Sequence, residues 1–253
     1  MNKLRVVELF AGIGAQASAL ERLGIPFEST VCEINQQAYS AYCSIHGQTP
    51  NLWDITKVEH LPECDLMTYS PPCQDISIAG NMKGLKEGSG TRSSLFWEVL
   101  RLLKDCKSRG VLPPVLVMEN VDSIVNDENL PHLNRFIIEL NNLGYESSYA
   151  LLNAKDYGVP QNRNRFFMVS IVDKGRFVFP KPIILDKCLK DLLEENVPES
   201  FYLTDEQLKT YERHRMDQRE KGNGFGIVPI DPERERVSHT VLTHPSKSSG
   251  NIV

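Results

Sequence analysis

The sequence predicts an α/β fold in which helices cover both faces of a doubly wound sheet. Three observations support this fold class. Short apolar runs rich in β-branched residues alternate along the chain with amphipathic helical segments. The first run, 4–10, leads through a glycine-containing turn, 11–15, into a helix, 16–23. Several later runs end in polar residues, as strands do when their carboxyl ends form a ligand site.

The composition is that of a globular protein. The 253 residues, 41% of them hydrophobic and 24% charged, allow one large domain or one and a half. A formal net charge of -5 creates no general basic field, so contact with nucleic acid would depend on a local cationic patch.

Cysteine usage and hydropathy exclude several classes of protein. None of the six cysteines forms a Cys-x-x-Cys pair or a Cys/His cluster with zinc spacing, so we expect reduced thiols and no metal. No apolar run approaches the roughly 18 residues of a membrane helix. The N-terminus runs directly into a strand, so we expect a cytoplasmic protein without signal peptide or membrane contact.

The turn after the first strand is typical of a nucleotide site. Its glycines, Gly12 and Gly14, let a ligand approach the backbone, and the following helix presents free N–H groups. Ala17 replaces the third glycine of the Gly-x-Gly-x-x-Gly fingerprint, so the turn alone is a weak signal. The next strand, 27–33, ends on Glu33, about 20 residues later, where an acid binds ribose hydroxyls. We favour that role over a charge at the start of the helix 36–46.

A third strand end offers Asp54, within 52–56. This segment alone favours a turn cap and a ligand contact about equally. A dinucleotide and S-adenosylmethionine would both use such a series of strand ends. The fourth strand end separates them, because it carries Pro72 and Cys73 and no candidate for a nicotinamide pocket.

The fourth strand, 65–69, leads into Ser70-Pro71-Pro72-Cys73-Gln74. Neither proline can donate a backbone hydrogen bond, so the strand stops and Cys73 follows on a stiff loop. A thiol at this edge of the sheet is placed to act as a nucleophile. A lone free cysteine is more often a small buried hydrophobe, and here the flanking motifs favour the nucleophile.

Two later segments also end in polar residues. The strand 114–121 carries Glu119 after four apolar residues, which is costly unless that glutamate has a partner or a task. Arg163 and Arg165 alternate into a strand, so we expect both on one face, suited to a phosphate or a base carbonyl. Ion pairs and surface charges are the alternatives. The polar, glycine-containing segment 81–92, which follows the loop of Cys73, predicts a functional loop.

The remaining segments complete the predicted organisation. We expect helices over 93–103, 130–142, 187–195 and 204–219, and a strand over 145–154. A linker-like stretch, 179–182, marks a change in character. We therefore predict two domains, 1–178 and 179–253.

The motifs resemble, in this order, those of the DNA cytosine-5 methyltransferases. The matching segments are Asp54-Ile55, Pro-Pro-Cys-Gln with Ser-x-Ala-Gly over 71–80, Glu-Asn-Val over 119–121, and Gln-x-Arg-x-Arg over 161–165. Ile76 departs from the aromatic residue usual in the family. The resemblance covers roughly 4–172. It implies a Rossmann-like S-adenosylmethionine-dependent methyltransferase sheet, followed by a partial target-recognition region.

The resemblance also implies a reaction and its residues. A methyl group would pass from S-adenosyl-L-methionine to carbon 5 of a flipped cytosine in double-stranded DNA, through a covalent adduct with Cys73. Glu119 would engage the base, Arg165 its oxygen, and Arg163 would support them. The implied cofactor-binding residues are Phe10, Ala11, Gly12, Ile13, Gly14, Glu33, Ile34, Asp54, Ile55, Pro72 and Leu95. The implied substrate contacts are Gln74, Ser77 and Gln161.

Two motifs that the family carries after its recognition region are absent. We therefore expect a truncated methyltransferase, or one subunit of a split enzyme completed by a second polypeptide, encoded by a bacterium or a phage. Three other functions stay open. They are an RNA cytosine-5 methyltransferase, whose usual Cys-Phe-Thr signature is missing, an inactive cofactor-binding subunit, and a nicotinamide-dependent oxidoreductase, supported only by the glycine turn and Glu33.

Overall fold

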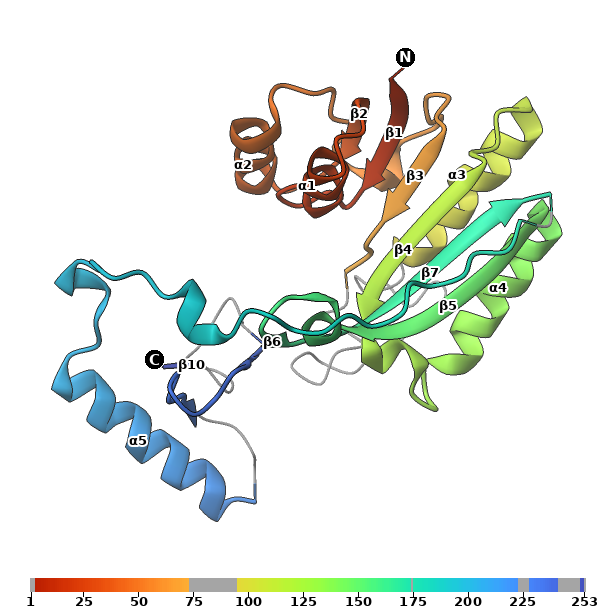
Figure 1. Ribbon diagram of the computed structural model, residues 1–253. Helices are drawn as coiled ribbons and strands as arrows, with labels where there is room; N and C mark the ends of the chain where they lie inside the picture. The colour runs from red at the N-terminus through yellow and green to blue at the C-terminus, as the bar shows by residue number, and fades with distance from the viewer. Residues whose placement is uncertain (1–2, 73–94, 174, 223–227, 241–250, 253) are drawn as a thin grey trace. The chain divides into compact units, whose positions relative to one another are not determined.

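The computed structural model describes residues 3–72, 95–173, 175–222, 228–240 and 251–252. Its main sheet has six strands in the order β2-β1-β3-β4-β7-β5 (Figure 1). These strands are β1 (Leu4–Leu9), β2 (Phe27–Cys32), β3 (Leu66–Tyr69), β4 (Val115–Val121), β5 (Tyr145–Asn153) and β7 (Asn164–Val172). β2, β1, β3 and β4 run parallel, whereas β7 is antiparallel to β4.

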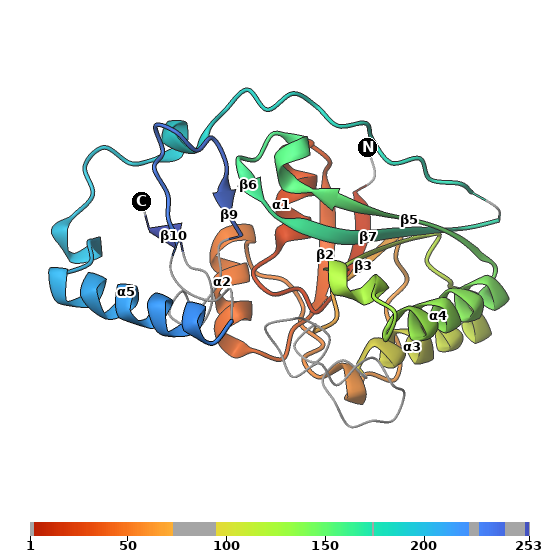
Figure 2. The ribbon, with the colours of Figure 1, turned by 90° about the horizontal axis from the view of Figure 1, so that it is seen from below.

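Four helices cover the two faces of this sheet (Figures 1 and 2). α1 (Ala15–Arg22) and α2 (Gln36–His46) lie on one face, and α3 (Phe96–Arg109) and α4 (Leu130–Leu143) lie on the other. β1 shows how one strand serves both layers. Val7 and Leu9 belong to the core cluster under α3 and α4, whereas Glu8 between them accepts a hydrogen bond from Tyr42 of α2. The predicted doubly wound α/β fold is confirmed.

The larger core lies between the sheet and the pair α3–α4, around an aromatic cluster. The rings of Phe96 and Phe136 pack with centroids 4.0 Å apart, and Tyr69 at the end of β3 lies 6.3 Å from Phe136. Seven side chains of α3 are buried, in the spacing of an amphipathic helix. This core fixes the strand ends that carry the candidate site.

Local signals set most helix ends where the sequence predicts them. The side chain of Asn35 accepts hydrogen bonds from the N–H groups of Gln37 and Ala38 and so begins α2. Gly144 follows α4 in a left-handed conformation. The short 3-10 helices are η1 (Ile55–Lys57), η3 (Asp122–Val125), η4 (Ala154–Tyr157), η5 (Leu189–Leu192) and η6 (Glu199–Phe201).

The helix predicted over 187–195 is wrong. Only η5 forms there, because Cys188 and Asp191 close a single turn through a capping box. Leu192 and Leu193 remain exposed, so the apolar side chains of the segment have no surface to pack against. A helix this short is marginal without such burial.

The chain forms two compact units. The first comprises 1–151 and 165–179, and the second comprises 152–164 and 180–253. The second contains α5 (Asp205–Glu220) and two small pairs of strands, β6 (Gln161–Asn162) with β9 (Ser238–His239) and β8 (Val228–Pro229) with β10 (Asn251–Ile252). The functional boundary after residue 178 stays a prediction. None of the helices in the described ranges is long and apolar enough to span a bilayer.

Candidate functional site

A cavity of about 250 Å³ lies at the carboxyl ends of β1, β2 and β3, within the first unit. Its volume is close to the lower limit of about 300 Å³ for pockets that hold small molecules. The lining residues are Phe10, Cys32, Glu33, Ile34, Trp53, Asp54, Ile55, Ser70, Pro72 and Leu95. The sequence analysis selected all of them except Cys32, Trp53 and Ser70. The cavity combines apolar walls with two carboxylates.

Glu33 joins the glycine turn to the cavity. Its Oε2 accepts the N–H of Gly12 at 2.9 Å, and its Oε1 accepts the N–H of Asn35 at 2.8 Å. Each carboxylate oxygen has two lone pairs, so both oxygens retain acceptor capacity for a ligand. Glu33 therefore interacts with the start of α2, which was the alternative considered for it, and it also lines the cavity.

Asp54 likewise combines its two predicted roles. It caps η1 by accepting the backbone N–H of Thr56 at 3.0 Å and the hydroxyl of Thr56 at 2.8 Å. These hydrogen bonds, the side-chain bond first, hold the pKa of the Asp54 carboxyl below its usual range. The carboxylate on the cavity wall is therefore ionised at neutral pH.

Phe10 and Trp53 take left-handed backbone conformations on the cavity wall. Their φ angles are 59° and 62°, and Asp173 is the third non-glycine residue with positive φ in the described part of the chain. Such conformations cost about 1–3 kcal/mol and cluster at functional sites. The ring of Trp53 meets Tyr39 edge-on at 5.1 Å. The sequence does not predict the left-handed conformation of Trp53, because a bulky residue rarely adopts a positive φ.

The other four predicted cofactor-binding residues, Ala11–Gly14, form the turn after Phe10 and do not line the cavity. Ala11 is buried and Ile13 is exposed. Gly12 contacts the cavity wall indirectly, through Glu33. Their role in binding a cofactor stays a prediction.

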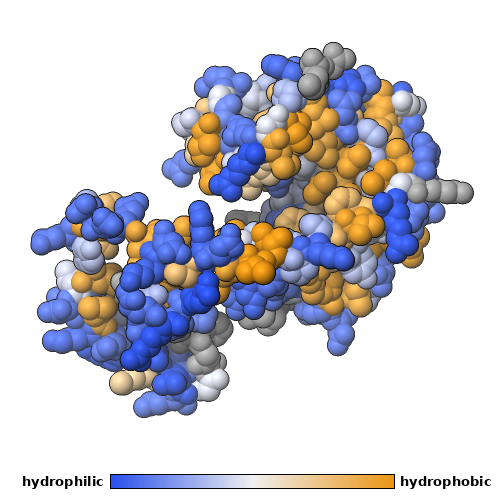
Figure 3. Space-filling model, in the orientation of Figure 1, coloured by the Kyte–Doolittle hydropathy of each residue, from blue (hydrophilic) through white to orange (hydrophobic). Residues whose placement is uncertain are grey.

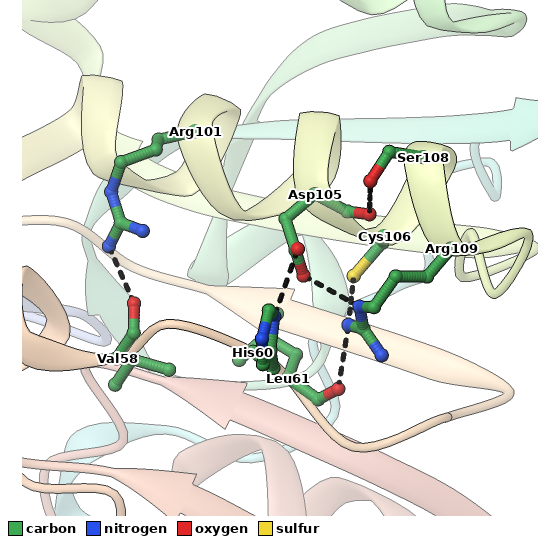
Figure 4. A network of polar contacts seen from close by, with 8 residues as sticks. All are labelled: Val58, His60, Leu61, Arg101, Asp105, Cys106, Ser108 and Arg109. Carbon is green, nitrogen blue, oxygen red and sulfur yellow. Dashed lines mark hydrogen bonds and ion pairs between the residues drawn. The ribbon is translucent and has the colours of Figure 1, made fainter.

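Helix α3 contacts the segment 55–61, which begins at Ile55 on the cavity wall. Figure 4 shows the contacts of Arg101 with Val58, of Asp105 with His60 and of Arg109 with Leu61. Arg101 donates to the carbonyl of Ile55 at 3.0 Å and to that of Val58 at 2.8 Å. About two turns further along the helix, Arg109 donates to the carbonyl of Leu61 at 3.0 Å. Because Leu95 at the start of the same helix also lines the cavity, α3 positions two of its walls.

The segment that precedes Cys73 is anchored from two elements. Gln16 of α1 donates to the hydroxyl of Ser70 at 3.0 Å, and the buried Asn120 of β4 donates to the carbonyl of Pro71 at 3.1 Å. Pro72 lies on the cavity wall. Cys73, Gln74, Ser77 and the predicted loop 81–92 lie outside the described residues.

Glu119 and Arg165 form an ion pair on the first unit. Arg165 Nε lies 2.9 Å from Glu119 Oε1, and the two side chains are 20% and 29% exposed. The antiparallel register places Arg165 opposite Val121, so the beginning of β7 meets the carboxyl end of β4. Glu119 therefore forms the ion pair that was the alternative to a catalytic role. Its partner is Arg165, which was itself predicted to be catalytic. The partly exposed pair remains accessible to a ligand.

Arg163 does not share the strand of Arg165. β7 begins at Asn164, and Arg163 lies in the break between β6 and β7, so the expectation of one strand face is wrong. Asn153 causes the break, because its side chain accepts the N–H of Arg163 at 3.1 Å and donates to Asn162 and Asn164. Arg163 and Gln161 belong to the second unit, where Gln161 pairs with Ser238.

Comparison with known proteins identifies the family. The C-5 cytosine-specific DNA methylases match residues 4–250. This chain belongs to that family. A type II methyltransferase, M2.ScrFI of Lactococcus lactis subsp. cremoris, is 35% identical over 81% of this chain and 71% of its own length. The orphan methyltransferase M.Rho11sI of Bacillus phage rho11s is 32% identical over 82% of this chain and 47% of its own length.

The methylase chain therefore spans between about half and three quarters of the length of these two relatives. Among solved structures, a mutant of DNMT2 from Spodoptera frugiperda has a TM-score of 0.71 at 22% identity, over 98% of this chain and 72% of that one. This likeness supports the Rossmann-like methyltransferase fold.

Sequence reasoning missed several positioning residues of the candidate site. Asn120 lies in the Glu-Asn-Val motif, but the sequence analysis assigned a role only to Glu119. Arg101 and Arg109 carried the ordinary signal of charges on a helix face. Only their contacts with backbone carbonyls of the 55–61 segment show what they do.

Proposed function

We propose that the chain is an S-adenosylmethionine-dependent DNA (cytosine-5)-methyltransferase. The observation that carries this proposal is the cavity, which combines Glu33 and Asp54 with apolar walls and reaches Pro72, one residue before Cys73. The ion pair of Glu119 with Arg165 supports it, because it gathers a carboxyl and a cation at the end of the strand next to β3.

The cavity fits S-adenosylmethionine better than a dinucleotide. Two carboxylates repel a pyrophosphate, whereas they accept hydrogen bonds from hydroxyl and amine donors and attract a positively charged sulfonium. The Gly12 N–H, which a pyrophosphate would require, is already donated to Glu33. In this proposal Glu33 binds the ribose hydroxyls, Asp54 and Ile55 contact the adenine, and the apolar walls exclude water. When bound, S-adenosylmethionine supplies an electrophilic methyl group.

The residues of the chain then act on the base. The Cys73 thiolate adds to carbon 6 of the cytosine and makes carbon 5 nucleophilic. Glu119 engages nitrogen 3 and the exocyclic amine, and Arg165 binds the base oxygen, where negative charge develops during the addition. After carbon 5 has taken the methyl group and lost its proton, the thiolate leaves. A stacked base cannot be reached, so the cytosine is flipped out at a cost of about a few kcal/mol.

The decisive experiment compares Cys73→Ala with Cys188→Ala, a substitution of another cysteine outside the cavity. Incorporation of a labelled methyl group into double-stranded DNA is expected to vanish in C73A and to persist in C188A. Binding of S-adenosylmethionine, measured by calorimetry, is expected to persist in both. A C73A variant that still methylates DNA would falsify the role of the nucleophile.

A second assay separates the alternatives. DNA containing 5-fluorocytosine should form a denaturation-resistant adduct with the wild-type chain, because the carbon 5 substituent cannot leave as a proton. Transfer to tRNA without transfer to DNA would indicate an RNA methyltransferase. Cofactor binding without transfer to either substrate would indicate a subunit that requires a second polypeptide, and mixing with such a polypeptide should then restore transfer.

A further inference from the structure

His46, the last residue of α2, packs directly against the glycine turn. Its side chain is only 2% exposed, and its Nε2 lies 3.2 Å from the carbonyl oxygen of Ile13. Gly14 has a φ of 88°, and a Cβ there would lie 2.5 Å from the ring of His46 and 2.8 Å from Tyr42. Position 14 therefore needs glycine both for its conformation and for the closeness of this ring.

Both ring nitrogens of His46 face acceptors. Nδ1 lies 2.9 Å from Oε1 of Glu21 on α1, and Nε2 faces the carbonyl of Ile13. A carbonyl and an ionised carboxylate can only accept, and a neutral imidazole carries a single N–H. The contact with Ile13 is therefore a hydrogen bond only when Nε2 carries the N–H that donates to it.

Two further titratable groups face the same region. Tyr42, one turn earlier on α2, stacks on the His46 ring at 4.8 Å between centroids. Its hydroxyl donates to Glu8 of β1, and burial raises the pKa of the Glu8 carboxyl. A test of His46 must therefore separate its effect from that of Glu8.

We propose that His46 is a positioning residue for cofactor binding, an inference that rests on the proposed function. Its bond to Ile13 fixes the orientation of the Ile13–Gly14 peptide. The same turn presents the Gly12 N–H to Glu33, which lines the cavity. Without a donor at the position of Nε2, the bond to Ile13 is lost. The turn, and with it Glu33, is then less well ordered for binding.

The test is the affinity for S-adenosylhomocysteine, measured by calorimetry. His46→Gln places an amide nitrogen where Nε2 was, so it should bind as the wild type does. His46→Asn reaches only toward Glu21, so its affinity should fall roughly five- to tenfold, the value of one hydrogen bond.

Two control variants complete the design. His60→Gln changes another histidine–carboxylate pair, in which His60 is 63% exposed and lies 2.9 Å from Asp105, and it should keep the wild-type affinity. Glu8→Gln should also keep it, which assigns the effect to His46. An H46N affinity equal to that of the wild type, or an H46Q affinity as low as that of H46N, overturns the inference while the proposed function stands. Absence of binding by the wild-type chain overturns both.

Discussion

The two compact units are stabilised in different ways. In the first unit, α3 alone buries seven side chains against the sheet and α4. In the second unit, α5 has 16 residues and none is buried, and its region in Figure 3 is largely hydrophilic. The buried residues of the described part of the second unit are Pro160, Ile230 and Ser238.

Hydrogen bonds rather than a core connect the segments of the second unit. The N–H of Ser238 donates to Pro160 at 2.9 Å, and the N–H of Leu189 donates to Arg236 at 2.9 Å. Regions with few buried apolar contacts open locally at a low free energy. The comparison teaches that the cavity belongs to the cooperative part of the molecule, whereas the second unit can change with little effect on the sheet.

The largest expected effect is on the stability of the first unit. Phe136 is fully buried against Phe96, so Phe136→Ala should lower the free energy of unfolding by about 3–5 kcal/mol. The matched change in the second unit, Phe201→Ala, removes a side chain that is 78% exposed and should cost less than about 0.5 kcal/mol. Urea unfolding followed by circular dichroism measures both. Equal losses would contradict the proposed difference between the units.

The next effect concerns the two arginines, which lie in different units. Arg165→Gln removes the partner of Glu119 and should lower kcat/KM for DNA by about 100-fold, or roughly 2.7 kcal/mol. Its unfolding free energy should change by less than about 1 kcal/mol, because the pair is partly exposed. Arg163→Gln should lower kcat/KM by only about tenfold. Steady-state methylation kinetics measure both variants, and a reversed ranking would transfer the main catalytic role to the second unit.

A smaller effect is expected at the start of α5. Thr204 and Gln207 form a capping box, and Thr204→Ala should weaken the helix by about 1 kcal/mol. Hydrogen exchange should accelerate in α5 while the amides of β1 and β4 keep their protection. Faster exchange in those strands would show that the units unfold together.

The smallest effect is the acid sensitivity of the first unit. Arg5 donates to Asp65 at 2.7 Å and, mainly through its side-chain hydrogen bonds, lowers the pKa of that carboxyl to about 2. The unfolded chain, with a pKa of about 3.9, takes up the proton first. The contribution of this pair is therefore complete above about pH 4 and disappears as pH falls toward 2. Asp65→Asn should be less sensitive over that range in urea titrations, and an unchanged profile would contradict the assignment.

The sequence allowed the fold and most of the cavity to be predicted, because both follow from local rules. Periodicity located most strands and helices, and strand ends in a parallel sheet must share one edge, which brought Glu33 and Pro72 together. Asp54 lines the same cavity, but the strand end expected there is wrong, because Asp54 caps η1. The capping of α5 by Thr204 was also readable. The first unit was predicted better because its helices are amphipathic, whereas 187–195 had an apolar pattern and nothing to pack against.

The unpredicted features depend on contacts between distant segments. Asn120 and Pro71 meet only because β3 and β4 are neighbours, and the break at Arg163 depends on the side chain of Asn153, ten residues earlier. The pairing of His46 with the turn at Ile13 requires two helices to pack on one face. Propensity and periodicity carry no information on such contacts.

The reversed direction of β7 has a consequence for deletions in this strand. The antiparallel register with β4 holds Arg165 opposite Val121. A deletion of one residue between Arg165 and Met168 would turn the guanidinium to the other side of the sheet. The length of this stretch therefore decides whether Arg165 can reach Glu119.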